Sequence, residues 1–442
     1  MMSLTMKTPN GKVADTGLLQ GDWQERLAAI VDAMREMSLQ TDPAEMVRSY
    51  ATRVRRLLPS SRWLSLSRRG LESPRYRITR SSTWTESVDP WKQKDRLPIL
   101  EGGLLGDLIY GDEPRLIDDI TPLLAADDPA IEYLAGYRSL MAAPHFDHGV
   151  ALNMVITLQT EPAAFDPETF PEWFWVSSLF GRATHNLVLK DELKQAYDIV
   201  ERELNLVAQI QRSLLPQVLP KIPGVELAAY YRTSQWAGGD YYDFFPLPDG
   251  RWGILIADVS GHGTPAAVMM AITHSLAHSL PGPADPPASL LGHVNRQLAQ
   301  HYTASNEVFV TAFYGVYDPA QRSLTYSSAG HNPPRLKRCG DGSVHALEEI
   351  GGPPLGLFED LEYDQTTLAL KPGDILAFYT DGITEAMDPS GAQFGVKRLD
   401  DQLRRCGLDS TGIIRDTIEA VDQFTGGQPP EDDRTLLIAK VS

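Results

Sequence analysis

The sequence of 442 residues is short of cysteine and of positive charge. It contains two cysteines, Cys339 and Cys406, and 40 basic residues against 58 acidic ones. Two thiols cannot form a disulfide framework or a four-thiolate zinc site, and they are typical of a reducing compartment. The formal net charge of −18 disfavours nucleic acid and anionic membranes as partners, because both are negatively charged. We therefore expect a cytoplasmic protein that does not bind nucleic acid.

Long hydrophobic runs are also missing. The most apolar stretches, residues 151–158 and 173–180, are far shorter than the ~20 residues that cross a bilayer. Residues 1–15 lack the apolar segment and cleavage site of a signal peptide. Neither a membrane span nor a secretory signal is expected.

The first part of the chain has the pattern of an α+β module. Residues 1–21 have no periodicity and are expected to be a flexible N-terminus. Apolar residues at helical spacing predict helices over 22–37 and 43–58. Strands are predicted at 62–67, 75–80, 115–117, 139–146 and 150–157, the last two joined by a turn at Asp147-His148-Gly149. With a closing helix ending near His185, these elements define a domain over residues 22–187.

The most periodic stretch of the chain follows, over residues 188–220. Its apolar residues recur at alternating steps of four and three, interrupted by Gln211: Leu193, Tyr197, Val200, Leu204, Val207 and Leu214. This heptad seam predicts a coiled-coil linker helix that pairs with a second copy, with Gln211 fixing the register. The alternative is an ordinary helix that lies on its own domain. Pro216, Pro220 and Pro223 end the helix in either case.

Residues 221–442 alternate between strands and helices. Helices are predicted over 265–280, 287–302, 396–406 and 411–424, the first with Thr264 as N-cap and Pro265 at the first helical position. Strands are predicted at 252–259, 309–317, 323–328, 361–370, 374–379 and 434–441. This order favours two sheets packed face to face and covered by helices.

Carboxylates stand where strands of this region meet polar or glycine-rich turns. The motifs are Gly238-Gly239-Asp240-Tyr241-Tyr242-Asp243, Asp258-Val259-Ser260-Gly261-His262-Gly263, Thr380-Asp381-Gly382 and Asp432-Asp433-Arg434-Thr435. One Asp-Gly after a strand is usually only a turn. If the sheets bring the four motifs together, however, their charges repel unless cations neutralise them, and oxygen ligands select Mg²⁺ or Mn²⁺.

The glycines of these motifs allow close approach of the backbone to an ion, and the Val259 carbonyl is our candidate main-chain ligand. Two ions about 3.5–4 Å apart can activate a water and clamp a phosphoryl group. The pattern therefore indicates hydrolysis of phosphate esters.

Together with Ala329-Gly330-His331-Asn332-Pro333, these motifs resemble the metal-dependent serine/threonine protein phosphatases, the PPM or protein phosphatase 2C superfamily. The likeness is to its bacterial branch of the sporulation stage II E and RsbU-like type. The resemblance implies an αββα sandwich with two Mn²⁺ or Mg²⁺ ions at one end. By that likeness Asp258 bridges the ions, Asp381 and Asp432 complete one of them, and Asp240 holds the other directly or through water. Asp433 stands where relatives often carry Asn, and we expect it to support the metal ligands.

The other residues of these motifs are expected to have supporting or structural roles, and only His262 is left with two interpretations. His262 either protonates the leaving group or caps a turn, and His331 is expected to brace a loop near the site. Asp243 is expected to orient a metal-bound water, whereas Tyr241 and Tyr242 are expected to pack. No arginine clamp for phosphate is evident, and Arg232 and Arg434 are the nearby candidates.

The N-terminal module resembles a GAF sensor domain. The resemblance rests on the element order and on the strand Tyr137-Arg138-Ser139-Leu140-Met141-Ala142-Ala143-Pro144 followed by a hairpin. No cysteine precedes Cys339, which excludes a thioether-linked tetrapyrrole but leaves a non-covalent small ligand open. Trp63, Trp84 and Trp91 either line a pocket or belong to the core. The alternative for the module is a dimerisation platform without a ligand.

The sequence thus predicts a homodimeric, Mn²⁺/Mg²⁺-dependent phosphoserine/phosphothreonine protein phosphatase regulated by an N-terminal sensor through the helical linker. Its partner is expected to be a phosphorylated signalling protein of the anti-anti-sigma-factor kind. One alternative is a catalytically silent scaffold that binds a phosphoprotein. Another is a nucleotide cyclase, because Gly238-Gly239-Asp240 resembles part of a diguanylate cyclase signature. The cyclase alternative lacks the following Glu-Phe and gives no role to Asp381 or Asp432.

Overall fold

The computed structural model describes residues 23–49, 61–86, 88–303, 308–404 and 409–442. The chain divides into two compact units, Met1–Tyr197 and Asp198–Ser442, called here the N-terminal and C-terminal units. Three features named in the sequence analysis lie outside the described residues: the expected flexible N-terminus, residues 50–58 of the helix predicted over 43–58, and Cys406. Within the described part of the chain, no helix is both long and apolar enough to cross a membrane.

The N-terminal unit is built on one antiparallel sheet of six strands. Their order is β3 (Ile99–Glu101), β2 (Arg75–Ser81), β1 (Arg62–Ser67), β6 (Val150–Gln159), β5 (Ser139–Asp147) and β4 (Arg115–Ile117). The helices of the unit are α1 (Trp23–Leu39), α3 (Gly103–Tyr110), α4 (Ile131–Leu134) and the first part of α5 (Phe170–Leu214), and residues 43–49 are also helical. Its main core joins the sheet to α3 and α4 through side chains such as Leu64, Ile156 and Leu105.

Five of the six strands of this sheet occupy the predicted positions. The turn between β5 and β6 places His148 at φ 48° and Gly149 at φ 83°, as a two-residue hairpin turn of the primed type requires. Strand β3 and helix α3 were not predicted. Because α3 is buried along most of its length, at Leu104, Leu105, Gly106, Leu108 and Ile109, its sequence has no polar face to reveal a helical period.

The three tryptophans have different surroundings. Trp84 packs against the main core of the N-terminal unit. Trp91 lines a pocket of about 330 Å³, and the Arg80 guanidinium lies 4.7 Å from the centre of its ring. Trp63 is half-buried in β1. Trp84 also lines a second pocket of about 330 Å³, so that a core contact and a place in a pocket do not exclude each other here.

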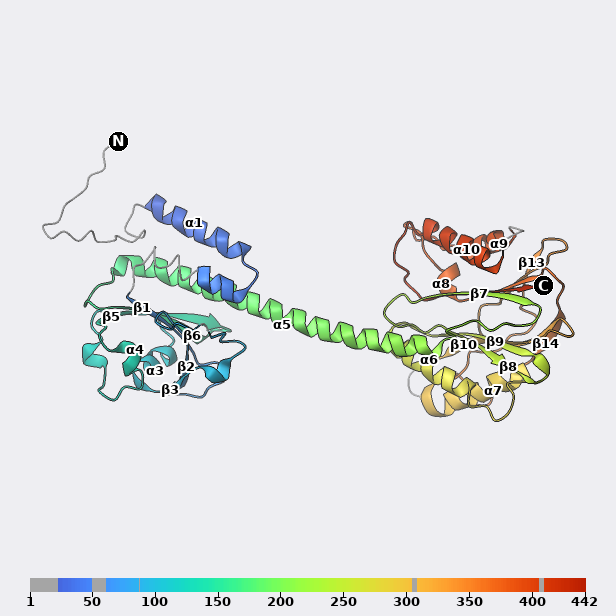
Figure 1. Ribbon diagram of the computed structural model, residues 1–442, viewed down its shortest axis with the longest axis horizontal. Helices are drawn as coiled ribbons and strands as arrows, with labels where there is room; N and C mark the ends of the chain where they lie inside the picture. Colours follow the sequence, from blue (N-terminus) through green and yellow to red (C-terminus); the bar gives the residue numbers. More distant parts are fainter. Residues whose placement is uncertain (1–22, 50–60, 87, 304–307, 405–408) are drawn as a thin grey trace, which may run out of the picture. The chain divides into compact units, whose positions relative to one another are not determined.

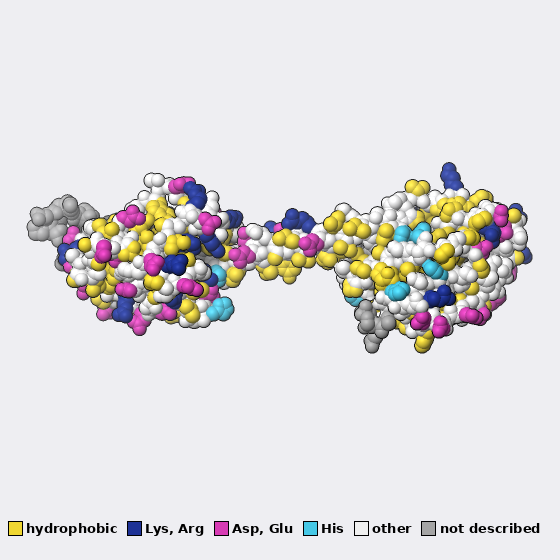
Figure 2. Space-filling model, turned by 90° about the horizontal axis from the view of Figure 1, so that it is seen from below, with side chains coloured by type: hydrophobic (Ala, Val, Ile, Leu, Met, Phe, Trp, Pro, Cys, Tyr) yellow, Lys and Arg dark blue, Asp and Glu magenta, His cyan; other side chains and the backbone are white. Residues whose placement is uncertain are grey.

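Helix α5 is a single helix of 45 residues, so that the predicted closing helix and linker helix are continuous. Residues 191–200 are exposed throughout, and apolar side chains are visible along the helix in Figure 2. The exposed large apolar residues of α5 are Trp175, Leu179, Leu189, Leu193, Tyr197, Ile199, Val200, Leu206 and Ile210. Gln211, in contrast, is buried and contacts the C-terminal unit rather than a paired helix, as described below.

The C-terminal unit consists of two antiparallel five-stranded sheets between two layers of helices (Figure 1). The first sheet has the order β14 (Thr366–Ala369), β11 (Ser323–Ala329), β10 (Val310–Asp318), β9 (Trp252–Val259) and β8 (Tyr241–Pro246). The second has the order β13 (Val344–Ala346), β12 (Arg335–Lys337), β15 (Ile375–Tyr379), β16 (Arg434–Val441) and β7 (Val225–Arg232).

Helices α6 (Thr264–Ala277) and α7 (Pro287–Leu298) cover the first sheet, and α8 (Asp381–Thr384), α9 (Gly395–Leu403) and α10 (Ser410–Phe424) cover the second. Short 3-10 turns stand at Lys94–Arg96, Thr121–Leu123, Pro167–Thr169 and Pro248–Gly250, and a π-helical turn, Ala299–Thr303, extends α7. A continuous apolar core fills the space between the sheets, where the rings of Phe313 and Phe378 have centroids 5.7 Å apart. This is the expected αββα sandwich.

Three local predictions for this unit were wrong. The N-cap of α6 is Gly263 at φ 78°, a conformation in which glycine is favoured, and the helix begins at Thr264. The strand predicted at 361–370 is limited to Thr366–Ala369. The helix predicted over 396–406 begins at Gly395 and is helical only to Leu403.

Candidate metal centre

The four aspartate motifs meet at one edge of the sandwich because of strand direction. Asp240 directly precedes β8, and Asp258 is the second-last residue of its antiparallel neighbour β9. Both therefore stand at the same end of these two strands in the first sheet. Asp381 follows β15 and Asp432 precedes its antiparallel neighbour β16, at one edge of the second sheet. Antiparallel pairing therefore brings residues far apart in sequence together.

Asp240 joins the two sheets. Its side chain is 1% exposed, and its Oδ2 accepts hydrogen bonds from Thr380 Oγ1 at 2.8 Å and Thr435 Oγ1 at 2.5 Å. Both threonines belong to the second sheet or its edge, whereas Asp240 leads into the first. Burial, followed by the charge of Asp433, raises the pKa of Asp240 well above its usual range.

Asp433 is the second buried carboxylate of the site. Its Oδ2 accepts a hydrogen bond from Gly239 N at 2.6 Å, and its Oδ1 accepts from Ser234 N at 2.8 Å and Ser234 Oγ at 3.2 Å. These donors fix the loop that carries Asp240 onto the start of β16. Asp433 thus ties the loop that carries Asp240 to the start of β16, and its expected role in supporting metal ligands stays a prediction.

The remaining aspartates are more accessible and repel one another. Burial, with the charges of Asp240 and the other site aspartates, raises the pKa of Asp258 to about 10. Burial also raises the pKa of Asp381, with Glu385 adding to the shift, and the pKa of Asp432. These mutual shifts indicate that the predicted site aspartates lie near one another, although among the described residues no three of their carboxylates come within 4.8 Å of one another.

Glycines make this close approach sterically feasible. A Cβ on Gly238 would overlap the Asp433 carboxylate, and a Cβ on Gly382 would overlap the Asp433 carbonyl oxygen. A Cβ on Gly239 would come within 2.9 Å of the Val259 carbonyl oxygen. The Val259 carbonyl, our candidate main-chain ligand, therefore lies against the loop that carries Asp240.

The donor set fits divalent cations. Among the ion pairs between described residues, none joins Asp240, Asp258, Asp381, Asp432 or Asp433 to a lysine or arginine. Clustered carboxylates without a basic partner are costly unless a cation neutralises them. An all-oxygen set of carboxylates and a carbonyl suits Mg²⁺ or Mn²⁺.

The two motif histidines have different environments. His331 is buried, and its Nδ1 lies 2.9 Å from the hydroxyl of Thr311, which pairs with Asp258 across the sheet. Burial lowers the pKa of His331 to about 4, so this ring is a neutral brace behind Asp258. His262 is exposed, with Nδ1 3.0 Å from Gln235 Nε2, and its charge acts on Asp432.

Two further candidates point elsewhere. Arg434 is buried and donates to Asp422 of α10 at 3.0 Å, although it lines a pocket together with Asp432, whereas Arg232 is exposed at the end of β7. Asp243, expected to orient a metal-bound water, instead accepts hydrogen bonds from Tyr241, Phe244 and His278. Tyr241 and Tyr242 are buried in the core, as expected.

Sequence analysis missed the contact of Gln211 with the loop Gly238-Gly239-Asp240, called here the metal loop. Gly238 N donates to Gln211 Oε1 at 3.0 Å, and Gln211 Nε2 donates to Gly238 O. The heptad pattern showed a polar residue at a core position, which is the signal available from sequence, but it assigned that position to a helix pair. The last turns of α5 thus hold the residue two before Asp240.

Comparison with known proteins gives consistent matches for the C-terminal unit. Residues 248–442 match the sequence profile of the family described as stage II sporulation protein E (SpoIIE). The phosphoserine phosphatase RsbU of Bacillus subtilis (strain 168) is 32% identical over 192 residues, which cover 43% of this chain and 56% of RsbU. The phosphoserine phosphatase RsbP of the same organism is 32% identical over 194 residues, covering 43% and 47%. The chain spans about half the length of these curated relatives.

Among solved structures, the PP2C domain of SiaA from Pseudomonas aeruginosa matches with a TM-score of 0.50 and 23% identity, covering 56% of this chain and 99% of that domain. The C-terminal unit therefore has the fold of that PP2C domain. Residues 248–442 are thus similar to the SpoIIE family and to the phosphatases RsbU and RsbP. Asp258, Asp381 and Asp432 lie inside the matched residues, and Asp240 lies just before them.

The raised pKa of Asp258 predicts how stability depends on pH when divalent ions are removed. The folded chain holds a proton up to about pH 10 that the carboxyl group releases near 3.8 when unfolded. Stability contributed by this group is therefore present at low pH and is lost as pH rises between those values. In chelator, the Tm of the parent should fall from about pH 5 to about pH 9, and the fall should be shallower in Asp258→Asn, which cannot ionise. Parallel Tm profiles for the two proteins would contradict this assignment.

Gly238 gives a steric prediction. In Gly238→Ala the new methyl group should displace the Asp433 carboxylate and lower the affinity for Mn²⁺ by about 10- to 100-fold, as loss of a supporting residue does in other metal sites. Gly340→Ala is the matched control, because its added Cβ would meet no atom within 4 Å. Mn²⁺ titration by calorimetry tests this prediction, and equal affinities in the two variants would refute it.

Proposed function

We propose that the chain is a Mn²⁺- or Mg²⁺-dependent phosphoserine/phosphothreonine protein phosphatase whose activity is set by its N-terminal unit through α5. The observation that carries the proposal is the convergence of Asp240, Asp258, Asp381 and Asp432 from two sheets, without a basic partner among the described residues. The names of the relatives RsbU and RsbP, both phosphoserine phosphatases, support the same activity.

In the proposed site Asp258 would bridge two ions, Asp381 and Asp432 would complete one of them, and Asp240 with the Val259 carbonyl would serve the other. Such ions, when bound, lower the pKa of water and neutralise phosphoryl charge. The chain's own residues keep the ligands in place: Thr380 and Thr435 orient Asp240, and Asp433 holds the Gly238-Gly239 turn. His262, which is exposed and whose charge acts on Asp432, would be available to transfer a proton there.

The substrate class follows from the site and its relatives. No contact between described residues holds an arginine against the aspartates, since Arg434 pairs with Asp422 and Arg232 is exposed. Recognition of the phosphate therefore falls mainly to the ions, and recognition of the protein to the surface around them. We propose a phosphorylated signalling protein, of the anti-anti-sigma-factor kind, as substrate. A silent scaffold is disfavoured because the complete set of carboxylates is present and held by specific hydrogen bonds.

The N-terminal unit is proposed to be a GAF-like sensor in a cytoplasmic homodimer. Its six-stranded sheet with a hairpin at β5–β6 is compatible with that resemblance. The pocket of about 330 Å³ beside Trp91 is a candidate site for a small ligand. Because Arg69, Arg77, Arg80 and Lys94 line this pocket, an anionic ligand would suit it.

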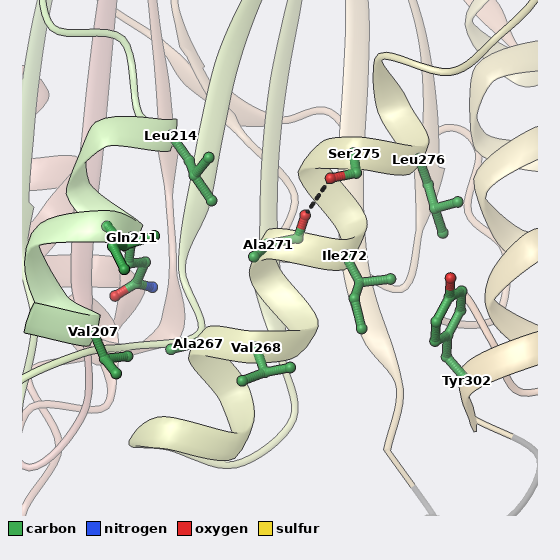
Figure 3. Close-up of a pocket in the computed structure, with 11 residues that line it drawn as sticks. Val207, Gln211, Leu214, Ala267, Val268, Ala271, Ile272, Ser275, Leu276 and Tyr302 are labelled. Atoms are coloured by element: carbon green, nitrogen blue, oxygen red, sulfur yellow. Dashed lines mark hydrogen bonds between the residues drawn. The ribbon is translucent and has the colours of Figure 1, made fainter. Parts of the chain in front are cut away.

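The end of α5 supports the proposed regulation. Val207, Gln211 and Leu214 line one side of a groove of about 480 Å³ whose other side is α6, including Val268 and Ile272 (Figure 3). The same helix buries Ala208 against Ala237 and Ala267, which adjoin the Asp240 and Asp258 motifs. Exposed apolar residues earlier in α5, such as Leu193 and Val200, suit pairing with a second copy. A change in that pairing would act on the metal loop through Gln211.

Replacing one metal ligand should abolish the proposed activity. Asp258→Asn and Asp381→Asn remove a charge without changing size, and each should lower Mn²⁺-dependent hydrolysis of an aryl phosphate by at least about 100-fold. Asp249→Asn, at an exposed turn, is the control. Metal-dependent turnover at the parental rate in Asp258→Asn would overturn the proposal.

The Gln211 contact gives a test of the linker. Gln211→Leu keeps the size of the side chain but leaves Gly238 N and O without partners, which costs about 1–3 kcal/mol. If α5 controls the metal loop, the Mn²⁺ concentration for half-maximal activity should rise about tenfold. Gln209→Ala, on the exposed face of the same helix, should leave it unchanged. An unaltered Mn²⁺ dependence in Gln211→Leu would count against regulation through this contact.

A further inference from the structure

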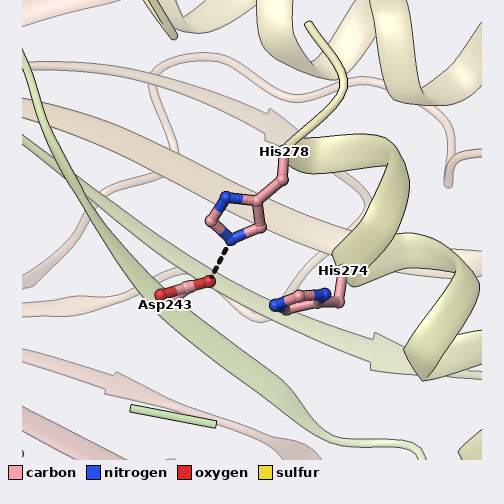
Figure 4. Close-up of side chains that lie close together, drawn as sticks. All are labelled: Asp243, His274 and His278. Atoms are coloured by element: carbon pink, nitrogen blue, oxygen red, sulfur yellow. Dashed lines mark hydrogen bonds and ion pairs between the residues drawn. The ribbon is translucent and has the colours of Figure 1, made fainter. Parts of the chain in front are cut away.

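A second group of metal-binding side chains lies where β8 packs against α6. Asp243 on β8, His274 on α6 and His278 at the C-cap of α6 each offer a ligand atom, and these atoms lie within 4.8 Å of one another (Figure 4). Among the residues that the structure describes, this is the one group of three histidine, cysteine or acidic side chains with such spacing. The proposed function assigns no role to any of the three.

The two histidines are arranged by the helix. Positions four apart in an α-helix share a face, so both imidazoles of His274 and His278 point toward β8. Their ring centroids are 4.6 Å apart. His278 Nε2 lies 2.8 Å from Asp243 Oδ2, which places the carboxylate of the strand opposite the pair.

The carboxylate is held in a fixed orientation by groups that are not ligands. Asp243 Oδ2 accepts a hydrogen bond from the Tyr241 hydroxyl at 2.7 Å, and Oδ1 accepts from Phe244 N at 2.7 Å. The Asp243 side chain is 11% exposed, whereas that of His278 is 46% exposed. The site is thus anchored in the core on one side and open to solvent on the other. Metal-binding carboxylates commonly have such supporting hydrogen bonds.

His274 supplies an independent observation. Its Nδ1 is buried and has no hydrogen-bond partner among the described residues, and Figure 4 shows the other ring nitrogen turned toward Asp243. Burial, followed by the charge of His278, lowers its pKa, which keeps the imidazole in the neutral form that binds metals. An aromatic edge from Tyr241, at 5.6 Å between centroids, fixes the ring. A neutral, oriented imidazole without a complete set of partners is suited to a ligand.

We propose that Asp243, His274 and His278 bind one zinc ion or a similar divalent transition metal, at a site separate from the aspartate centre. Two imidazoles and one carboxylate match zinc, with a fourth position left to solvent, whereas Mg²⁺ and Mn²⁺ prefer the all-oxygen set of the aspartates. The ion would join β8 to α6. Because β8 follows Asp240 and α6 follows Asp258, this link would also restrain the two motifs relative to each other.

The test is a Zn²⁺ titration of the full chain by calorimetry in excess Mg²⁺, which occupies the all-oxygen site. We expect one equivalent of Zn²⁺ to bind to the parent, and we expect His274→Ala and His278→Gln each to weaken that binding by at least about tenfold. His278→Gln keeps a donor toward Asp243, which preserves the local fold. His293→Ala, which removes an imidazole of α7 that contacts Ser279, is the control and should bind as the parent does. Co²⁺ in place of Zn²⁺ should give the visible absorption of a four-coordinate ion in the parent and lose it in the two variants.

Three results would overturn the proposal. The first is the absence of Zn²⁺ binding by the parent in excess Mg²⁺, which would leave His278 and Asp243 as a simple ion pair. The second is unchanged binding in both His274→Ala and His278→Gln. The third is loss of the Zn²⁺ equivalent in Asp258→Asn with retention in the histidine variants, which would assign the ion to the aspartate centre. This experiment does not depend on phosphatase activity.

Discussion

Repulsion among carboxylates at one edge of the sandwich is the constraint on which the rest of the C-terminal unit depends. Asp240 and Asp433 are almost fully buried, and Asp258, Asp381 and Asp432 surround them. The structure holds these charges together by hydrogen bonds from Thr380, Thr435 and Gly239, and by glycines that leave no side chain between them. Bound divalent cations would reduce the repulsion among these carboxylates. The same cations could bind the oxygens of a phosphoryl group.

The loop around Gly238 is held from two sides. On one side Gln211 of α5 exchanges two hydrogen bonds with the Gly238 backbone, and on the other Gly239 N donates to Asp433. A displacement of the last turns of α5 would therefore move Gly238, which is two residues before Asp240. Asp240 could then shift without any rearrangement of the apolar core. This short path gives the proposed control by the linker a physical basis, because a loop held by few bonds shifts at less cost than a packed sheet.

Much of this arrangement could be predicted from the sequence. Strands β1, β9 and β16 occupy their predicted residues because alternating or continuous apolar runs between turn signals have few other solutions. The site aspartates could be recognised because a carboxylate beside a buried strand is energetically costly unless a positive group or an ion compensates its charge. Gln211 could not be assigned, since a heptad position looks the same whether it faces a second helix or its own domain. Helix α3 was not predicted, because burial along most of its length leaves too few polar residues to show a helical period.

The cluster of Asp243, His274 and His278 shows a different limit of sequence reasoning. The spacing of the two histidines is visible in the sequence, but their proximity to Asp243 depends on how α6 lies across β8, which only tertiary packing determines. The same packing also affects how Asp240 lies relative to Asp258, because β8 begins beside Asp240 and α6 begins six residues after Asp258. The position of α6 against β8 is thus one variable shared by both groups of ligands. Any interaction that fixes this position, whether an ion at the histidines or the apolar contacts of α5 with α6, acts on the geometry of the aspartates as well.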